Sequence, residues 1–297
     1  MSNTTASLRR KIRSAGDLQS VVRTMKALAA ANIGQYEQSV RALGHYYRSV
    51  ELGLSVCFSR NATAPIAESA SRPEARSVGV IVFGSDQGLV GRFNDVVADF
   101  AFQALAELPG KPRVWAVGER VHGRLADAGL ALAGIHAVPN SVQAITPLIG
   151  RILIESEARQ SRGEIGALHL FYNRPTSGAI YQPVQQRLLP LDNAWRHELA
   201  QRPWPSRNLP EVMAGDATTL PALIREYLFV SLFRACAESL ASENASRLAA
   251  MQRADKNIDE LLEGMNGTFH RLRQSGIDAE LFDVVSGFDA LTEPASI

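Results

Sequence analysis

Residues 220–272 read LPALIREYLFVSLFRACAESLASENASRLAAMQRADKNIDELLEGMNGTFHRL, and they repeat a mostly apolar position every seven residues. A second row accompanies the first, offset by three residues. This alternating spacing of three and four residues is the pattern of a coiled-coil seam. The two rows consist of Leu223, Val230, Ala237, Asn244, Met251, Ile258, Met265 and Leu272, and of Leu220, Tyr227, Arg234, Ala241, Leu248, Asp255, Leu262 and Phe269.

The same spacing recurs at the other end of the chain. Two long helices with matching seams predict an antiparallel shaft built from the two ends of the chain. We expect one helix over residues 4–58 and a second from Thr218 to Leu291, capped by Thr218 or Thr219 with Pro221 in its first turn. The N-terminal rows are Leu8, Ala15, Val22, Ala29, Tyr36, Leu43, Val50 and Cys57, and Ile12, Gln19, Lys26, Ile33, Val40, Tyr47 and Leu54.

Polar side chains interrupt these seams and allow two interpretations. They can fix the register of the helix pair, as polar seam residues do in coiled coils. Alternatively, they can contact something that surrounds the shaft. Both interpretations stay open for Gln19, Lys26, Arg234, Asn244 and Asp255.

The charge of the chain is balanced overall but uneven along its length. The net charge is +1, which gives no general argument for binding nucleic acid or membranes. Residues 1–50 hold eight basic and two acidic side chains, whereas residues 220–291 hold seven basic and eleven acidic ones. Opposite signs favour pairing of the two helices over two unrelated solvated faces.

The middle of the chain has a different period. Short apolar, β-branched runs alternate with helical patterns near 94–108, 119–128 and 141–160, which predicts an α/β fold with a mainly parallel sheet. We expect residues 190–216 to be irregular. The predicted domains are a coiled-coil helix in 1–60, a Rossmann-like α/β domain in 77–216 and a second coiled-coil helix in 217–297, with a proline-containing linker at 60–76. The expected strands are Ser77–Phe83, Arg113–Val117, Gly134–Val138, Ala167–Tyr172 and Val184–Leu189.

The most distinctive local motif is GSDQGLVGRFN, residues 84–94, between the first strand and a helix. Phosphate-binding loops occupy this place in α/β sheets. The motif lacks the Gly-Lys-Ser/Thr of a Walker A loop and the glycine spacing of the dinucleotide fingerprint. Asp86 could act as a nucleophile, but a tight structural turn is the favoured interpretation. The residues that define this turn are Ser85, Asp86, Gly88, Gly91 and Asn94.

Other kinds of site have little support in the sequence. The two cysteines, Cys57 and Cys236, are too few for a disulfide framework. The six histidines are scattered and show no zinc-binding spacing. A G-x-S-x-G nucleophile elbow is absent, and so is an apolar run of membrane-spanning length. We therefore expect no metal, no cofactor and no membrane span.

Three stretches together resemble one family. They are the basic start LRRKIRS (8–14) with Gln19 and TMKALAA (24–30), the loop SDQGLVGRFN (85–94), and a C-terminal set. The third set comprises Glu226, Tyr227, ESLASE (238–243), Arg247, Ala250, Met251, Ala254, Asn257, Arg273, Gln274, Ile277, Glu280 and VVSG (284–287). In order and spacing they are similar to the γ subunit of F-type ATP synthase, the central rotor stalk.

The chain also departs from the pattern of that family. Gln87 stands where the family has a basic residue, Val90 where it has cysteine, and Arg92 where it has a small residue. Asp278 replaces a threonine and Phe288 an alanine, and residues 200–216 barely match. These departures suggest a divergent γ subunit, for example from a second bacterial ATPase.

The resemblance implies a mechanical function without catalytic residues or cofactors. The shaft would turn inside an α3β3 hexamer, while the α/β domain would lie with an ε subunit on the membrane c-ring. The protein would then be peripheral, on the cytoplasmic face of the bacterial inner membrane. Rotor–stator contacts are implied for Arg9, Arg10, Lys11, Met25 and Lys26, which suit an acidic lever on β, and for Arg273, Gln274, Asp278 and Glu280.

Two alternatives from other functional classes stay open. An α/β hydrolase that uses Asp86 and carries a helical stalk would be active as an isolated chain. A coiled-coil scaffold would be stable alone, and it would not bind α and β subunits.

Overall fold

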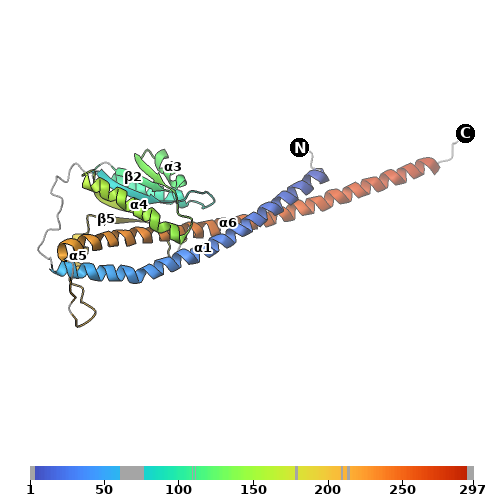
Figure 1. The fold of residues 1–297 in the computed structure, drawn as a ribbon. Coiled ribbons are helices and arrows are strands. Elements are labelled where there is room, and N and C mark those ends of the chain that lie inside the picture. Colours follow the sequence, from blue (N-terminus) through green and yellow to red (C-terminus); the bar gives the residue numbers. More distant parts are fainter. Residues whose placement is uncertain are drawn as a thin grey trace. The chain divides into compact units, whose positions relative to one another are not determined.

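The computed structural model describes residues 4–60, 77–108, 110, 112–177, 180–208, 210–212 and 215–292 (Figure 1). The expected linker therefore lies mostly outside the described residues. The chain divides into two compact units, Met1–Leu28 with Leu248–Ile297, and Ala29–Arg247. We call them the terminal unit and the α/β unit. The domain bounds expected from the sequence pattern stay a prediction.

A long helix lies near each end of the chain, as predicted. α1 spans Thr5–Arg60 and α6 spans Asp216–Thr292. The beginning of α6 differs from the expectation, because Thr218 and Thr219 lie inside its first turn and both hydroxyls donate to the Gly215 carbonyl, at 3.3 and 2.8 Å. The threonines therefore bond back to the helix start instead of capping it from outside.

The predicted seams are largely confirmed by burial. In the terminal unit Val22, Met251 and Ile258 form a buried cluster, and in the α/β unit Ala29 and Tyr36 of α1 are buried. Arg234 is the exception, because about half of its side chain is exposed and its guanidinium pairs with Glu238 at 2.7 Å. A guanidinium is more stable at the surface than in an apolar seam.

The α/β unit contains a five-stranded sheet in the order β3-β2-β1-β4-β5. All neighbouring pairs are parallel except β4 and β5, which confirms the mainly parallel sheet. The strands are β1 Ser77–Phe83, β2 Pro112–Val117, β3 Leu132–His136, β4 Ile165–Arg174 and β5 Gln182–Leu189.

Three helices connect these strands close to the expected places, namely α2 Phe93–Ala106, α3 Glu119–Asp127 and α4 Val142–Ser161. A fourth helix, α5 Asn193–Ala200, corrects the expectation that residues 190–216 are irregular. Asp192 caps α5 by accepting from the Ala194 amide at 2.9 Å, and Leu199 is buried. Trp195 and Ala200 also pack against the core, and this packing together with the cap stabilises a helix of only two turns.

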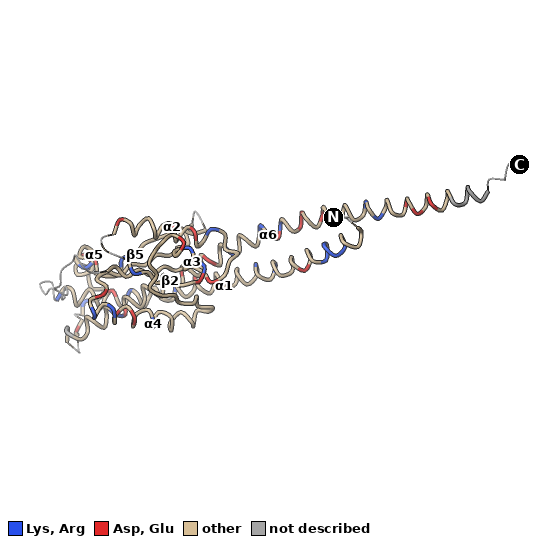
Figure 2. Tube along the Cα trace, turned by 90° about the horizontal axis from the view of Figure 1, so that it is seen from above, with Lys and Arg blue, Asp and Glu red and all other residues tan. Residues whose placement is uncertain are grey.

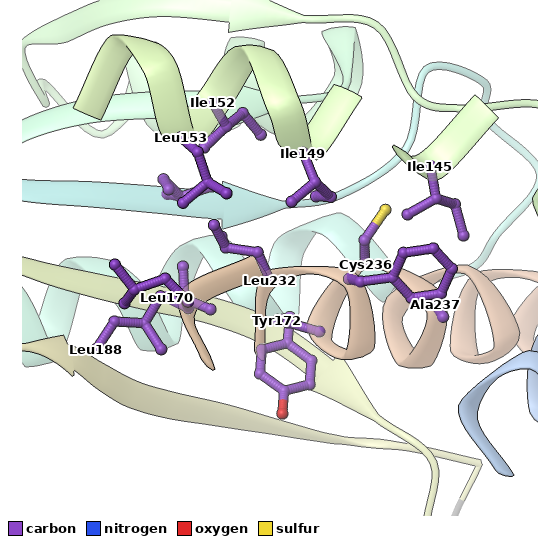
Figure 3. Packing of buried hydrophobic residues seen from close by; sticks show 14 of the residues in the cluster. Ile145, Ile149, Ile152, Leu153, Leu170, Tyr172, Leu188, Leu232, Cys236 and Ala237 are labelled. Atoms are coloured by element: carbon purple, nitrogen blue, oxygen red, sulfur yellow. The ribbon is translucent and has the colours of Figure 1, made fainter. Parts of the chain in front are cut away.

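Alternation along the strands sends side chains to two apolar layers. On one face, Val80 and Val82 of β1 pack against α2 and α3. On the other face, Ile81 and Phe83 belong to a core that includes α4 and α6 (Figure 1). Figure 3 shows Leu232, Cys236 and Ala237 of α6 between α4 and strands β4 and β5. The terminal helix α6 is therefore also a core helix of the α/β unit.

No helix in the described part of the chain is apolar over a length that could cross a bilayer.

Candidate functional site

The loop at residues 84–92 leaves the carboxyl end of β1, in the place that the sequence predicted. The Gly84 amide donates to the Val117 carbonyl at 2.9 Å, and the Arg120 amide donates to the Ser85 carbonyl at 2.9 Å. Two backbone bonds thus join the loop to β2 and to the start of α3. A Cβ on Gly84 would lie 2.5 Å from Val121 Cγ1, so only glycine allows this approach.

Ser85 and Asn94 bind one another across the loop. Asn94 Oδ1 accepts from the Ser85 amide at 2.9 Å, and Asn94 Nδ2 donates to Ser85 Oγ at 2.8 Å. The Ser85 hydroxyl donates in turn to the Gln87 carbonyl at 2.9 Å. Both side chains are buried, so neither group is presented toward a ligand.

Asp86 joins two distant segments to this loop. One carboxylate oxygen accepts from the Glu119 amide at 3.0 Å, and the other accepts from the Val138 amide at 2.9 Å. A carboxylate that accepts hydrogen bonds from two backbone amides joins the two segments that carry those amides. The arrangement supports the structural interpretation over the nucleophile interpretation.

The two candidate glycines of the loop have different surroundings. Gly91 has a φ of 57°, a left-handed conformation that glycine adopts without steric cost. Gly88 does not share this conformation, and a Cβ there would meet only Arg120 Nη2 at 3.9 Å. The backbone conformation thus favours glycine at Gly91 and does not at Gly88.

Asp86→Asn should destabilise the chain by about 1–2 kcal/mol, because an amide group has one acceptor oxygen for two backbone donors. Denaturant unfolding of the purified chain measures the change. Asp127→Asn, on the exposed end of α3, is the matched control and should change stability by less than about 0.5 kcal/mol. Equal effects of the two substitutions would show that Asp86 does not hold the backbone.

The candidate contact residues at the two ends of the chain lie in the terminal unit. Arg9, Arg10 and Lys11 are exposed, and basic residues follow one another near the N-terminal end of α1 (Figure 2). Arg9 stacks over the Phe269 ring at 5.6 Å, while Arg10 and Lys11 line a groove with residues 260–268 of α6. The basic start of α1 therefore presents positive charge to solvent beside α6.

The candidate contact residues near the C-terminal end of α6 form a second exposed group. Arg273, Gln274, Asp278 and Glu280 are all exposed, in turns that follow Phe269. The apolar side chains of the same turns were not among the expected contact residues, although Ile277, Val284 and Val285 belong to the stretches that carry the resemblance. They are about half exposed or more: Ile277, Leu281, Phe282, Val284 and Val285. A run of exposed apolar residues at the end of a helix indicates a surface that a partner covers.

Met25 and Lys26 differ from the other candidates, because they take part in helix packing. Met25 is half-buried against the Val22, Met251 and Ile258 cluster. Lys26 Nζ lies 2.8 Å from Asp255 Oδ2. These contacts place the pair at the α1–α6 seam of the terminal unit.

Asp255 is the centre of a charged layer in this seam. Besides Lys26, Asp255 Oδ1 accepts from Arg23 Nε at 3.2 Å and from Gln19 Nε2 at 3.3 Å. Gln19 Nε2 also donates to Asp259. In the α/β unit, Asn244 donates to the Leu240 carbonyl at 2.8 Å and accepts from Asn32 Nδ2 at 3.4 Å. These contacts favour the register interpretation for Gln19, Lys26, Asn244 and Asp255.

The donors around Asp255 hold the pKa of its carboxyl below the ordinary value, with the Lys26 hydrogen bond as the largest cause. A lowered acid pKa stabilises the folded state above the ordinary pKa, and this contribution is lost as pH falls through the folded pKa. Lys26→Ala should therefore raise the pKa of Asp255 toward the ordinary value, as measured by carboxyl-carbon NMR titration. Lys256→Ala, which removes a cation paired with Glu260 at 3.8 Å, should leave the titration of Asp255 in place. An unchanged Asp255 pKa in Lys26→Ala would contradict the pairing.

Comparison with known proteins shows which family has this sequence. The family model described as ATP synthase matches residues 4–291. The "ATP synthase gamma chain" of Mycolicibacterium paratuberculosis is 29% identical over 99% of both chains. That of Clavibacter sepedonicus is 31% identical over 95% of both.

Solved structures share the fold at low sequence identity. The rotor of the Euglena gracilis mitochondrial ATP synthase aligns with a TM-score of 0.61 at 15% identity, and the alignment covers 92% of this chain and 98% of that chain. The central stalk of the Tetrahymena thermophila enzyme aligns with a TM-score of 0.56 at 19% identity, covering 79% and 99%. The long terminal helices and the intervening sheet are therefore a known arrangement.

Proposed function

Because this chain belongs to the ATP synthase family as a gamma chain, we propose that its terminal helices turn inside an α3β3 hexamer while its α/β unit meets an ε subunit and the c-ring. The chain is the central rotor stalk, which couples ion flow through the membrane ring to ATP synthesis or hydrolysis at the β subunits. The α1–α6 seam carries this proposal, since a paired helix with a charged register layer is suited to transmit rotation.

The proposed role is non-catalytic. The side chains of the 84–94 loop that could act in catalysis form hydrogen bonds within the protein. Asp86 accepts from two backbone amides, and Ser85 accepts from Asn94. A nucleophile needs an adjacent base and a free path to the substrate. The loop supports the fold of the α/β unit instead, and catalysis belongs to other subunits of the complex.

The exposed ends of the two helices are the proposed contact surfaces with the hexamer. The positive charge of Arg9, Arg10 and Lys11 fits an acidic lever on β, through steering and complementarity. A second set of polar contacts with the hexamer would be made by Arg273, Gln274, Asp278 and Glu280. These residues lie beside the exposed apolar side chains of the same turns of α6. The hexamer would cover these apolar side chains in the assembled enzyme.

The proposed location is the cytoplasmic face of a bacterial inner membrane, with attachment through partners. The bacterial sources of the similar gamma chains support it. The departures at Gln87 and Val90 support the further proposal that the chain serves a second ATPase, which requires another γ gene in the same genome.

Co-expression with the α and β subunits of the same genome tests the central-stalk proposal. We expect a complex of about three α, three β and one copy of this chain, whose ATP hydrolysis depends on the chain. A chain that remains alone would contradict the proposal and favour a scaffold. Phosphatase activity of the isolated chain, abolished by Asp86→Asn, would favour the hydrolase alternative.

Met25→Lys should lower the number of ions translocated per ATP hydrolysed, because it adds a charge at a half-buried position near the proposed rotor–stator contact. Met25→Leu is the matched control, since a volume-conserving apolar exchange costs less than about 1.5 kcal/mol. Ion pumping and ATP hydrolysis are measured together in membrane vesicles that carry the assembled complex. Unchanged pumping per ATP in Met25→Lys would show that this position does not face the stator.

A further inference from the structure

Helix α6 is buried on both sides of Glu238, but its buried side chains change from mostly apolar to mostly polar there. Before this residue, Leu232, Cys236 and Ala237 pack in the apolar core between α4 and strands β4 and β5 (Figure 3). After it the helix stays buried but becomes polar. Ser239, Ser242, Glu243 and Ser246 are each no more than 6% exposed. Burial of so many polar groups is costly unless each finds a hydrogen-bond partner.

This polar stretch lies at the point where the sheet reverses its strand order. The chain runs from β1 outward to β2 and β3, and then returns to the other side of β1 as β4. Ser246 Oγ donates to the carbonyl of Val90, in the loop after β1, at 2.5 Å. Glu238 pairs with Arg174, the last residue of β4, at 3.0 Å. In open α/β sheets, the crevice between such strand ends is the usual place for a bound ligand.

Three buried oxygen atoms of this stretch have no hydrogen-bond partner in the described structure: Ser239 Oγ, Ser242 Oγ and Glu243 Oε2. These residues are spaced i, i+3 and i+4, so they share one helix face with Ser246. They lie along α6 between Glu238, which contacts Arg174 at the end of β4, and Ser246, which contacts Val90 in the loop after β1.

We propose that ordered water molecules occupy this region, between α6 and the carboxyl ends of β1 and β4, and bridge the three oxygens. Water fits this set because it donates to the carboxylate oxygen and exchanges hydrogen bonds with the two hydroxyls. An anion does not fit, because the carboxylate oxygen would repel it. A cation is not needed for charge balance, since Glu243 pairs with Arg247 at 2.6 Å. The site lies within the folded chain and does not depend on an α3β3 partner.

Ser242→Ala in the full chain distinguishes a hydrated site from a dry one. If water binds Ser242, the substitution removes a hydrogen bond from the network, and the melting temperature should fall by about 2–4 °C. If the site is dry, alanine relieves an unpaired buried hydroxyl and favours the helix, so the melting temperature should rise. Ser55→Ala is the matched control, because this buried helical hydroxyl bonds its own helix at the Leu52 carbonyl, at 2.8 Å. The control shows the change in melting temperature when a bonded buried hydroxyl is lost, so a melting temperature of Ser242→Ala at or above that of the unsubstituted chain would overturn the proposal.

A crystallographic map of the full chain at a resolution that shows solvent is the second measurement. We expect water density within hydrogen-bonding distance of Ser242 Oγ and of at least one of Ser239 Oγ and Glu243 Oε2. Direct packing of protein atoms with no density would overturn the proposal. A peak that rubidium replaces would also overturn it, in favour of a monovalent cation. These outcomes are independent of whether the chain assembles with α and β subunits.

Discussion

Gly84→Ala is expected to destabilise the chain by about 3 kcal/mol, near the upper end of overpacking effects. The added Cβ would overlap Val121 Cβ and lie 2.5 Å from Val121 Cγ1 and 2.8 Å from Asn94 Oδ1. Val121 cannot yield easily, because it is fully buried in α3 and β-branched. Asn94 cannot yield without releasing the Ser85 amide. The new methyl group therefore has to displace either α3 or the loop, and denaturant unfolding of the purified chain measures the cost.

A neighbouring glycine and a compensating substitution separate this steric explanation from backbone flexibility. Gly88→Ala lies in the same loop, where the added Cβ would make only an ordinary contact with Arg120 Nη2 at 3.9 Å, so it should change stability by less than about 0.5 kcal/mol. Val121→Ala is destabilising alone, but it should recover part of the loss when combined with Gly84→Ala, because it removes the obstructing methyl groups. Strictly additive effects in the double variant would show that Val121 is not the obstacle.

The elements were largely predictable because their periods differ strongly. β1 was predicted with its observed bounds, because a short β-branched run that ends at a glycine is typical of a buried strand. The long helices followed from their heptad rows, which agree with the burial of Val22, Ala29 and Met251. α5 was missed because a helix of eight residues repeats its pattern only about twice. Arg234 was misplaced because the heptad pattern carries no information on where a local ion pair pulls a side chain.

The contacts of the candidate site were less predictable than its position. The 84–94 loop could be located from its glycines and its place after a strand. The partners of Asp86 are the amides of Glu119 and Val138, and a backbone amide has no residue-specific signature. The Lys26–Asp255 pair needed the register of two helices that are far apart in sequence, which charge totals do not supply. The polar face of α6 was visible in the sequence, but its burial depends on where the sheet reverses.

Leu232→Ala is expected to cost about 2–5 kcal/mol, the range for a large-to-small change in a packed core. The side chain is fully buried and lies among residues of α4, β4 and β5, including Leu153, Leu170 and Leu188 (Figure 3). These neighbours belong to secondary-structure elements that are fixed by other contacts, so they cannot collapse fully into the space left by the truncation. The loss should appear as a lower midpoint of denaturant unfolding in the purified chain.

The same variant also tests how α6 transmits rotation, since this helix is at once a core element of the α/β unit and a partner of α1. If torque passes through the packing of Leu232, Leu232→Ala should reduce ATP synthesis by the assembled complex more than it reduces the amount of complex. Ile154→Ala is the matched control, because this α4 side chain is 62% exposed and should change stability by less than about 0.5 kcal/mol. Leu232→Met keeps the volume and should retain coupling. Equal losses of synthesis and of assembled complex in Leu232→Ala would mean that the packing stabilises the subunit without carrying torque.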